Sequence, residues 1–403
     1  MKGPVYLDHA ATTPVDARVA AKMAEVLTDP RWFGNAASES HGYGEAAAAL
    51  IEQARAQVAA AVNAVPSEVI WTSGATESNN LGLWGVAHYY RDRGRHLITV
   101  RTEHKAVLDP CRELARRGWS VTYLAPDCNG LVGPAQVQAA WRADTVLVSV
   151  MHVNNEIGVI QDIAAIAAVC AARGAWLHVD AAQSMGKCEL DFAALGADLM
   201  SLSAHKAYGP KGVGALLISR ARRGAAGAAG AAGAAGAAAI QLAPLQYGGG
   251  QEGGLRAGTL ATHQIVGMGA AFELAAAAWR ADLERITNLQ RRLWQGLSAI
   301  GGVFRNGDPE HCVPHVLNVS FEGVEGESLL AAVRDDIAVS TGSACTSATA
   351  EPSYVLRALG RDERLSESSL RFGLGRGSSE ADVDAAVAVL GREVPRLRRI
   401  AGA

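Results

Sequence analysis

The chain has 403 residues, of which 49% are hydrophobic, and a formal net charge of −3 at pH 7. This length is enough to bury a large core and predicts about two domains. The small net charge excludes a basic surface for nucleic acid and a polybasic flank for an acidic membrane. The N-terminal residues lack the apolar stretch of a signal peptide, and apart from a Gly/Ala repeat no segment is apolar over a membrane-spanning length. We therefore expect a cytoplasmic protein with no membrane attachment.

The first part of the sequence predicts two helices. Thr13 has the features of an N-cap, with Pro14 at the first helical position, for a helix that ends near Leu27. Residues 33–38 predict a loop. Apolar residues then recur at helical spacing over residues 45–62, which predicts the second helix.

Strands and helices alternate regularly after this point. The predicted strands lie at residues 69–72, 97–100, 121–124, 145–150, 176–179, 199–202 and 214–219. Helical patterns separate most of them, at residues 105–117, 134–141 and 163–172. This alternation predicts an α/β fold with a mainly parallel sheet wrapped by helices, whose ligands collect at the loops that follow the strand ends.

The pattern changes in the last third of the sequence. A Gly-Ala-Ala repeat at residues 224–239 has no large or charged side chain, so we expect a surface insertion without a role in the core. Two helices are predicted at residues 263–278 and 281–300. A smaller α+β unit follows, with strands at residues 315–321, 337–340 and 369–374 and helices at residues 327–335 and 380–393. We place a change of domain near residue 262.

A lysine follows one of the predicted strands, in the segment SAHKAYGP at residues 203–210. Its position places the amine of Lys206 at the edge of the sheet. A desolvated amine there could lose its proton and attack a carbonyl to form a Schiff base. An isolated turn lysine is more often solvated, so this interpretation depends on the groups around it.

Two further segments could complete a site for pyridoxal phosphate. The segment TSGATES at residues 72–78 links a strand to a helix, where converging backbone N–H groups can bind an anion, although ordinary capping is as good an explanation. Asp180 ends a buried strand and needs a cationic or donor partner, either a protonated heterocyclic nitrogen or a structural salt bridge. A Schiff-base lysine, an acid for the ring nitrogen and a phosphate cradle are what pyridoxal phosphate requires.

Three more residues have side chains suited to chemistry. His104 follows a strand and could lie over a flat ring and move protons, or simply cap a helix. Cys345 lies among Gly, Ser, Thr and Ala residues, so we expect an exposed, reactive thiol rather than a packing residue. None of the six cysteines forms a C-x-x-C pair, which predicts reduced thiols and no metal site. Arg371 alternates with apolar residues on a strand and could bind a carboxylate or form a structural ion pair.

Taken together, these residues resemble the cysteine desulfurases of the NifS/IscS group, closest to the housekeeping iron–sulfur cluster assembly members. The matching segments are YLDHAATTPVD, TSGATESNNL, TEHKAVLD, MHVNNEIGVIQDI, HVDAAQSMGK, SAHKAYGPKGVGAL, LNVSFEGVEGESLL, TGSACTSATAEPSYVLRALG and LRFGLGR. The resemblance implies a fold-type-I pyridoxal phosphate enzyme of the class V aminotransferase family. Its large cofactor-binding domain would span residues 14–262, with a seven-stranded sheet, and its small α+β domain residues 1–13 and 263–403.

The resemblance also implies a role for each site residue. Lys206 would hold the cofactor as a Schiff base and then act as acid and base, and His104 would stack on the ring. Cys345 would attack the sulfur of the bound cysteine, leaving alanine and an enzyme persulfide, and could transiently ligate an iron–sulfur cluster. Asp180 would contact the ring nitrogen, and Gln183 and Asn155 would contact the ring hydroxyl. The phosphate would be held by Ala75, Thr76, Ser203 and His205, together with Thr259 of the partner subunit. Asn35 and Arg371 would bind the substrate carboxylate.

The resemblance implies L-cysteine as substrate, an obligate homodimer, and sulfur delivery to an iron–sulfur scaffold protein and to tRNA thiolation. Ala36, Ala204 and Gly253 stand where the family commonly has Pro, Gly and Arg, and the Gly/Ala repeat is foreign to it. The chain ends at Ala403, short of the tail with which housekeeping members dock the scaffold, so scaffold docking is the least supported expectation. Two alternatives remain: a selenocysteine lyase or other C–S lyase that does not need Cys345, and a weakened paralogue acting as an assembly subunit.

Overall fold

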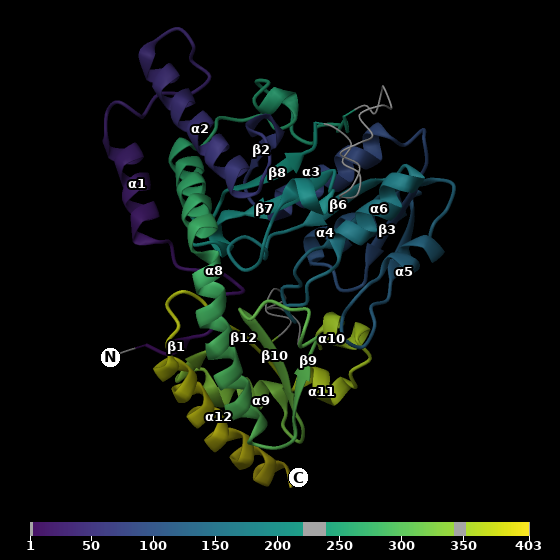
Figure 1. The fold of residues 1–403 in the computed structure, drawn as a ribbon, viewed down its shortest axis with the longest axis vertical. Helices are drawn as coiled ribbons and strands as arrows, with labels where there is room; N and C mark the ends of the chain where they lie inside the picture. Colours follow the sequence, from purple (N-terminus) through teal and green to yellow (C-terminus); the bar gives the residue numbers. More distant parts are fainter. Residues whose placement is uncertain (1–2, 221–238, 342–351, 403) are drawn as a thin grey trace.

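The computed structural model describes residues 3–220, 239–341 and 352–402. The chain forms a larger part around a seven-stranded sheet and a smaller part around a three-stranded sheet, and α8 (Thr262–Ser298) runs alongside both (Figure 1). The predictions for Cys345 and for nearly all of the Gly/Ala repeat lie outside the described residues.

The larger sheet confirms the predicted α/β fold. Its strands lie in the order β2, β8, β7, β6, β5, β3, β4, and β8 is antiparallel to both neighbours whereas the other adjacent pairs are parallel. In chain order they are β2 (Val69–Thr72), β3 (His96–Val100), β4 (Ser120–Leu124), β5 (Thr145–Met151), β6 (Trp176–Asp180), β7 (Leu199–Ser203) and β8 (Gly214–Ile218). All seven were predicted, each to within about one residue at its ends. Every strand except the edge strand β4 is buried along its whole length, as expected of a sheet covered on both faces.

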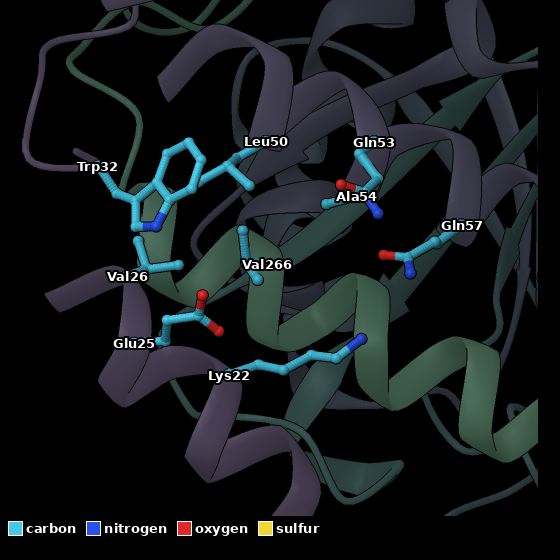
Figure 2. A pocket seen from close by; sticks show the side chains of 9 residues that line it. All are labelled: Lys22, Glu25, Val26, Trp32, Leu50, Gln53, Ala54, Gln57 and Val266. Atoms are coloured by element: carbon cyan, nitrogen blue, oxygen red, sulfur yellow. The ribbon is translucent and has the colours of Figure 1, made fainter. Parts of the chain in front are cut away.

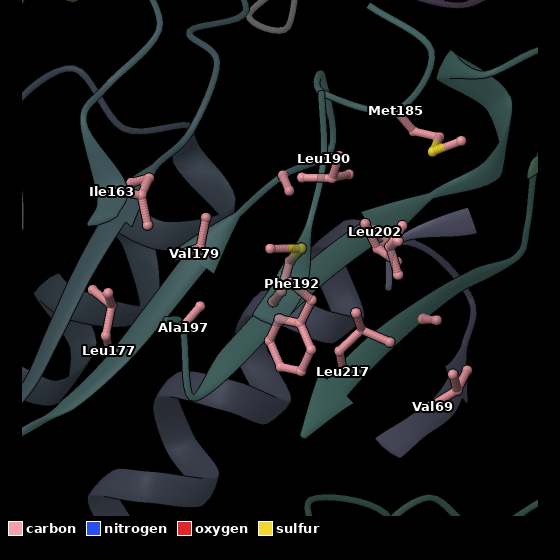
Figure 3. Packing of buried hydrophobic residues seen from close by; sticks show 14 of the residues in the cluster. Val69, Ile163, Leu177, Val179, Met185, Leu190, Phe192, Ala197, Leu202 and Leu217 are labelled. Carbon is pink, nitrogen blue, oxygen red and sulfur yellow. The ribbon is translucent and has the colours of Figure 1, made fainter. Parts of the chain in front are cut away.

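Helices cover both faces of this sheet and bury an apolar cluster on each. They are α2 (Gly42–Ala61), α3 (Ala75–Tyr89), α4 (Lys105–Arg116), α5 (Pro134–Ala139), α6 (Ile163–Arg173) and α7 (Phe192–Leu195). Leu177 and the fully buried Phe192 belong to the larger cluster (Figure 3). Leu97 and Ile98 of β3 lie in different clusters, because successive side chains of a strand point to opposite faces.

The smaller part is built on an antiparallel sheet in which β10 (Val316–Phe321) lies between β9 (Val303–Asn306) and β12 (Ser369–Gly373). The N-terminal β1 (Val5–Tyr6) pairs in parallel with β11 (Ile337–Ala338). The helices of this part are α9 (Gly326–Val333), α10 (Tyr354–Ala358), α11 (Glu363–Glu367) and α12 (Glu380–Ala401). The sequence predicted β10, β11, β12, α9 and α12 but not α10, α11 or β9. β9 is a short edge strand in which only Asn306 is buried.

A single helix, α8, replaces the two helices predicted at residues 263–278 and 281–300. No glycine or proline interrupts the sequence between them, so nothing breaks the helix. Its first half contributes Phe272 to the core of the larger sheet, and its second half contributes Leu293 to the core of the smaller one. We propose a division into two domains that share α8, with the change of core inside this helix. None of the helices in the described parts of the chain has the length and apolar character needed to cross a bilayer.

The first helix begins later than predicted. α1 (Ala17–Thr28) has Asp16 as its N-cap, whose carboxylate accepts a hydrogen bond from the backbone N–H of Arg18 at 3.0 Å. The predicted N-cap, Thr13, is buried and contacts the turn that follows β7 instead. The prediction of Thr13 as a cap was therefore wrong, because a distant turn competes for its hydroxyl.

A cavity of about 160 Å³ lies where α1, α2 and α8 meet (Figure 2). Trp32 lies at one side of it, opposite polar side chains of α2. No residue of the predicted catalytic or cofactor site lines this cavity. The candidate site is therefore elsewhere.

Candidate active site

A larger cavity, of about 400 Å³, opens at the carboxyl ends of β5, β6 and β7. This is the position where the parallel α/β pattern predicts a ligand. Ten of the predicted site residues line it: Ala75, Thr76, His104, Asn155, Asp180, Gln183, Ser203, His205, Lys206 and Arg371. The structure thus brings together residues from both parts of the chain.

Lys206 ends a short 3₁₀ turn, Ala204–Lys206, directly after β7. The N-terminal segment holds this turn, because the backbone N–H and the hydroxyl of Thr13 both donate to the carbonyl oxygen of His205 at 2.9 Å. The Thr13 hydroxyl also accepts from the backbone N–H of Tyr208 at 2.8 Å. Tyr208 has φ of 62°, a left-handed conformation that a non-glycine residue adopts only when its surroundings compensate the strain. The amine at position 206 is therefore held by a constrained turn.

Asp180 is buried at the end of β6, where 3% of its surface is exposed. One carboxylate oxygen accepts from the side-chain amide of Asn79 at 2.7 Å, and the other from the backbone N–H of Ala182 at 3.0 Å. Both donors are neutral, so they orient the carboxylate without balancing its charge. A buried carboxylate that is oriented in this way on a cavity wall suits a cationic ligand atom such as a protonated ring nitrogen.

The N-terminus of α3 offers an anion site at the same cavity. Gly74 precedes the helix with φ of 151°, and no side chain among the described residues caps the N-terminus. A Cβ at Gly214 would lie 2.6 Å from the Cα of Gly74, so only glycine lets β8 pack this closely against the loop. The exposed end of the helix dipole and its unpaired N–H groups suit a phosphate. Together with Asp180 and Lys206, this arrangement fits pyridoxal phosphate.

Two histidines at the cavity are held in their neutral form. His104 is the N-cap of α4, and its Nδ1 accepts a hydrogen bond from the backbone N–H of Ala106 at 3.1 Å. The proton of the neutral ring therefore lies on Nε2. Burial, with a smaller effect of the nearby Lys206 charge, lowers the pKa of His104. Burial and the neighbouring lysines lower the pKa of His205 to about 4, while its Nδ1 pairs with the hydroxyl of Thr12 at 3.1 Å.

Arg371 is buried on β12 and reaches the cavity from the smaller sheet. Its Nη1 donates to the carbonyl oxygen of Asn155 at 3.0 Å, and its Nη2 donates to the carboxylate of Asp8 at 2.8 Å. Its Nε is buried and has no hydrogen-bond partner in the described residues. The ion pair that the sequence left open is therefore present, and the buried Nε–H is available for a further acceptor.

The two chain segments that flank residues 342–351 contact the walls of this site. The hydroxyl of Ser340 donates to Asp8 at 2.8 Å, on the carboxylate that also pairs with Arg371. On the other side, the hydroxyl of Ser353 donates to the buried carboxyl of Glu156 at 2.5 Å. Burial raises the pKa of Glu156 to about 7. Cys345 itself lies outside the described residues.

The sequence matches the family "Aminotransferase class-V" over residues 5–386. The chain belongs to this family. Two curated relatives extend the match: "Cysteine desulfurase IscS" of Methylococcus capsulatus is 56% identical over 400 residues, which cover 99% of this chain and 94% of the relative. The protein of the same name from Photorhabdus laumondii is 52% identical over 400 residues, covering 99% of this chain and 95% of the relative.

Solved structures of similar proteins share the class-V fold. A "NIFS-LIKE PROTEIN" superposes with a TM-score of 0.87 at 33% identity and covers 98% of this chain and 100% of the other. The structure described as "SspA in complex with cysteine" has a TM-score of 0.78 at 36% identity and covers 92% and 98% of the two chains. The membership and the fold that the resemblance implied are confirmed.

Two residues of the predicted active site, Asn35 and Thr259, do not line the cavity. Asn35 is exposed before α2, and its side-chain oxygen accepts from the backbone N–H of Ala37 at 3.0 Å. Thr259 is also exposed and does not line the cavity. Nearby, Arg256 pairs with Glu77 of the α3 first turn at 2.8 Å, which ties this segment to the anion site. The roles of Asn35 and Thr259 stay predictions.

Sequence reasoning missed three polar groups of the site. Asp8 pairs with Arg371, and Thr13 holds the turn of Lys206. Glu103 is buried next to His104 and accepts from the backbone N–H of Met151 at 2.6 Å. Burial raises the pKa of Glu103 well above its usual range, an effect that the Met151 N–H only partly offsets. The only sequence signal for Glu103 was its position beside His104 at a strand end.

Proposed function

We propose that this chain is a pyridoxal phosphate-dependent cysteine desulfurase, which converts L-cysteine to L-alanine and takes up the sulfur as a persulfide on Cys345. The observation that carries the proposal is the cavity in which Lys206, Asp180 and the uncapped N-terminus of α3 converge. The relatives named cysteine desulfurase support it, since 52% to 56% identity extends over nearly the full length of both chains.

The residues that would hold the cofactor fall into groups, each contacting a different part of the cofactor. Lys206 would bind its aldehyde carbon, Asp180 would pair with its ring nitrogen, and Asn155 and Gln183 would contact its ring hydroxyl. The phosphate would be held by Ala75, Thr76, Ser203 and His205, together with Thr259 of the partner subunit. When bound, pyridoxal phosphate supplies an electron sink for a carbanion at the substrate Cα.

Proton movement would be shared by Lys206 and His104. Because the Nδ1 of His104 is occupied by the N–H of Ala106, Nε2 is the atom that can exchange a proton with the substrate. Lowering of its pKa by burial keeps the ring neutral at physiological pH, so it presents a donor without adding positive charge near Lys206. Lys206, which lines the same cavity, would move protons as well.

Sulfur transfer needs a carboxylate anchor and a thiolate. Arg371 would hold the substrate carboxylate, with Asn35 as a second donor. The thiolate of Cys345 would form an S–S bond with the substrate sulfur as the C–S bond breaks. The electron pair of the C–S bond would pass to carbon, where a proton completes alanine. Cysteine and an enzyme thiol thus become alanine and an enzyme persulfide, with no external oxidant. The hydrogen bonds of Ser340 with Asp8 and of Ser353 with Glu156, on either side of residues 342–351 in the sequence, support the proposal.

The proposal extends to partners and location. Persulfide sulfur would pass to an iron–sulfur scaffold protein and to other acceptors, such as those used in tRNA thiolation. Cys345 could also transiently ligate an iron–sulfur cluster. A contribution of Thr259 from the partner would require a homodimer. Free thiols at Cys111, Cys128, Cys188 and Cys312 support a reducing, cytoplasmic location.

The test compares wild type with Cys345→Ala and Lys206→Ala. We expect wild type to bind pyridoxal phosphate with a visible absorbance band and to form alanine from cysteine. Cys345→Ala should keep the band and lose alanine formation, because the cofactor site is intact but the sulfur acceptor is absent. Lys206→Ala should lose both the band and alanine formation. The exposed Cys128→Ala serves as the matched control and should behave as wild type.

Two outcomes would contradict the proposal in different ways. Alanine formation at the wild-type rate in Cys345→Ala would exclude the thiolate step and favour a selenocysteine lyase or another C–S lyase. A wild type that binds no pyridoxal phosphate would favour an assembly subunit without catalysis.

A further inference from the structure

Lys187 is a buried amine that the proposed mechanism does not use. It follows β6 by seven residues, in the turn that also carries Gln183, and 5% of its surface is exposed. Burial, with the nearby charge of Lys206 as the next cause, lowers its pKa to about 7. Either protonation state of the amine keeps N–H donors that need an acceptor.

In the described parts of the chain, no carboxylate pairs with this amine. Lys187, Lys206, His9 and His315 line a small cavity of about 10 Å³, enough for about one water. Burial lowers the pKa of His9 to about 4 and that of His315 well below its usual range, so both rings are neutral. Asp282, also at this cavity, pairs with Arg376 at 2.8 Å. Among the described residues, the amine of Lys187 donates to the side-chain oxygen of Gln183 and forms no ion pair.

The amide of Gln183 is fixed at both of its ends. Its oxygen accepts from Lys187, and its Nε2 donates to the backbone oxygen of Ala10 at 2.7 Å. A flipped amide would place two donors together at Lys187 and two acceptors together at Ala10. Both Ala10 and Gln183 line the large cavity, and the bond to Ala10 uses only one of the two N–H groups of Nε2.

We propose that Lys187 is a positioning residue: it holds the oxygen of Gln183, so that the amide N–H faces the cavity and donates to the ring hydroxyl of the cofactor. The inference rests on the proposed function, and it adds a residue behind the site that does not touch the cofactor. Removing Lys187 would allow the amide to turn its oxygen toward the ring hydroxyl, which loses a donor and brings two oxygens together.

The experiment is a double-mutant cycle of Lys187→Met, Gln183→Leu and the double variant. The readouts are the dissociation constant for pyridoxal phosphate added to apoprotein and the absorbance maximum of the bound cofactor. Lys187→Met keeps chain length while removing the amine, and we expect it to weaken cofactor binding by about tenfold, the effect of losing one hydrogen bond to a charged group. It should also shift the absorbance band. In the Gln183→Leu background the same substitution should have no further effect, because Lys187 acts through the amide.

Circular dichroism and thermal unfolding of the apoproteins separate positioning from damage to the fold. Lys22→Met, an exposed lysine on α1, is the matched control and should leave binding and absorbance unchanged. If Lys187→Met does not fold, Lys187→Leu removes the same amine with a shorter side chain. The inference would be overturned, with the proposed function left standing, if folded Lys187→Met kept wild-type binding and absorbance. It would also be overturned if the losses of cofactor affinity in Lys187→Met and Gln183→Leu added fully in the double variant. Absence of pyridoxal phosphate binding in wild type would overturn the proposed function and the inference with it.

Discussion

Arg371 has more hydrogen-bond donors than its neighbours in the described parts of the chain satisfy. Two of its nitrogens are used by Asn155 and Asp8, and its buried Nε has no partner in the described residues. An unsatisfied buried donor costs free energy, so its occurrence on a cavity wall marks a place where an acceptor binds. A substrate carboxylate would supply that acceptor, and Asp8 would keep the plane of the guanidinium oriented toward it.

Replacing Arg371 with lysine tests this arrangement. An ammonium group is a point charge and cannot reach Asp8, Asn155 and a carboxylate in one plane. We expect Arg371→Lys to raise the KM for cysteine about ten- to hundredfold, the loss of one charge-assisted hydrogen bond, with a smaller change in kcat. Steady-state alanine formation measures both constants. Arg305→Lys on β9, at the other edge of the same sheet, is the control, and an unchanged KM in Arg371→Lys would rule out this role.

At the scale of elements, the turn after β7 depends on the N-terminal segment. Thr13 is 2% exposed and bridges His205 and Tyr208 with a single hydroxyl. On the other side, the ring of Tyr208 packs under the guanidinium of Arg376 at 4.3 Å, and its hydroxyl accepts from the Arg376 backbone N–H at 2.6 Å. These contacts offset the strain of the left-handed Tyr208 backbone.

Thr13→Val removes the bridge at almost constant volume. The substitution leaves the backbone N–H of Tyr208 without its acceptor in a buried position, which costs about 1–3 kcal/mol. We expect the free energy of unfolding of the apoprotein, measured in urea, to fall by this amount. Thr28→Val, at the exposed end of α1, should change it little. Equal free energies of unfolding for the two variants would show that the turn after β7 does not depend on the Thr13 hydroxyl.

The strands of the larger sheet could be predicted because each is a short, mainly apolar run between turn residues, and all except β4 are fully buried. β9 gives no such pattern, since Phe304 is exposed and Arg305 and Asn306 are polar. α8 was divided in two because its apolar pattern changes between its halves. That change reflects two different cores, with Phe272 in one and Leu293 in the other, and the helix itself continues.

The site could be predicted where its residues lie in segments with their own pattern, such as the strand ends at Asp180 and Lys206. Supporting residues could not be predicted from local patterns. Asp8 meets Arg371 across 363 positions of sequence, and Thr13 meets His205 across 192. Lys187 lies seven residues after the end of β6 but meets Gln183 by the geometry of one turn. Only the folded arrangement reveals such pairs.

At the scale of the whole molecule, buried titratable groups link stability to pH. His178 bridges three strands, with Nδ1 at 2.8 Å from the Ser149 hydroxyl and Nε2 at 3.0 Å from that of Ser201. Burial lowers its pKa to about 4, from an ordinary value of 6.5. As pH falls from 6.5 to 4, the unfolded chain therefore binds a proton that the native chain does not, and stability falls. Glu156 acts in the opposite sense, because its raised pKa of about 7 makes the native chain hold a proton longer as pH rises.

His178→Gln should reduce the loss of stability in acid. Glutamine keeps groups that can pair with the two serines but cannot be protonated, so the variant lacks the penalty for keeping this ring neutral. We expect the decrease in the free energy of unfolding between pH 6.5 and pH 4 to be smaller than that of wild type by about 3 kcal/mol, even if the variant is less stable at neutral pH. Urea unfolding of the apoproteins across this range gives the slope. His88→Gln, an exposed histidine of α3, should keep the wild-type slope, and a wild-type slope in His178→Gln would mean that other groups govern acid unfolding.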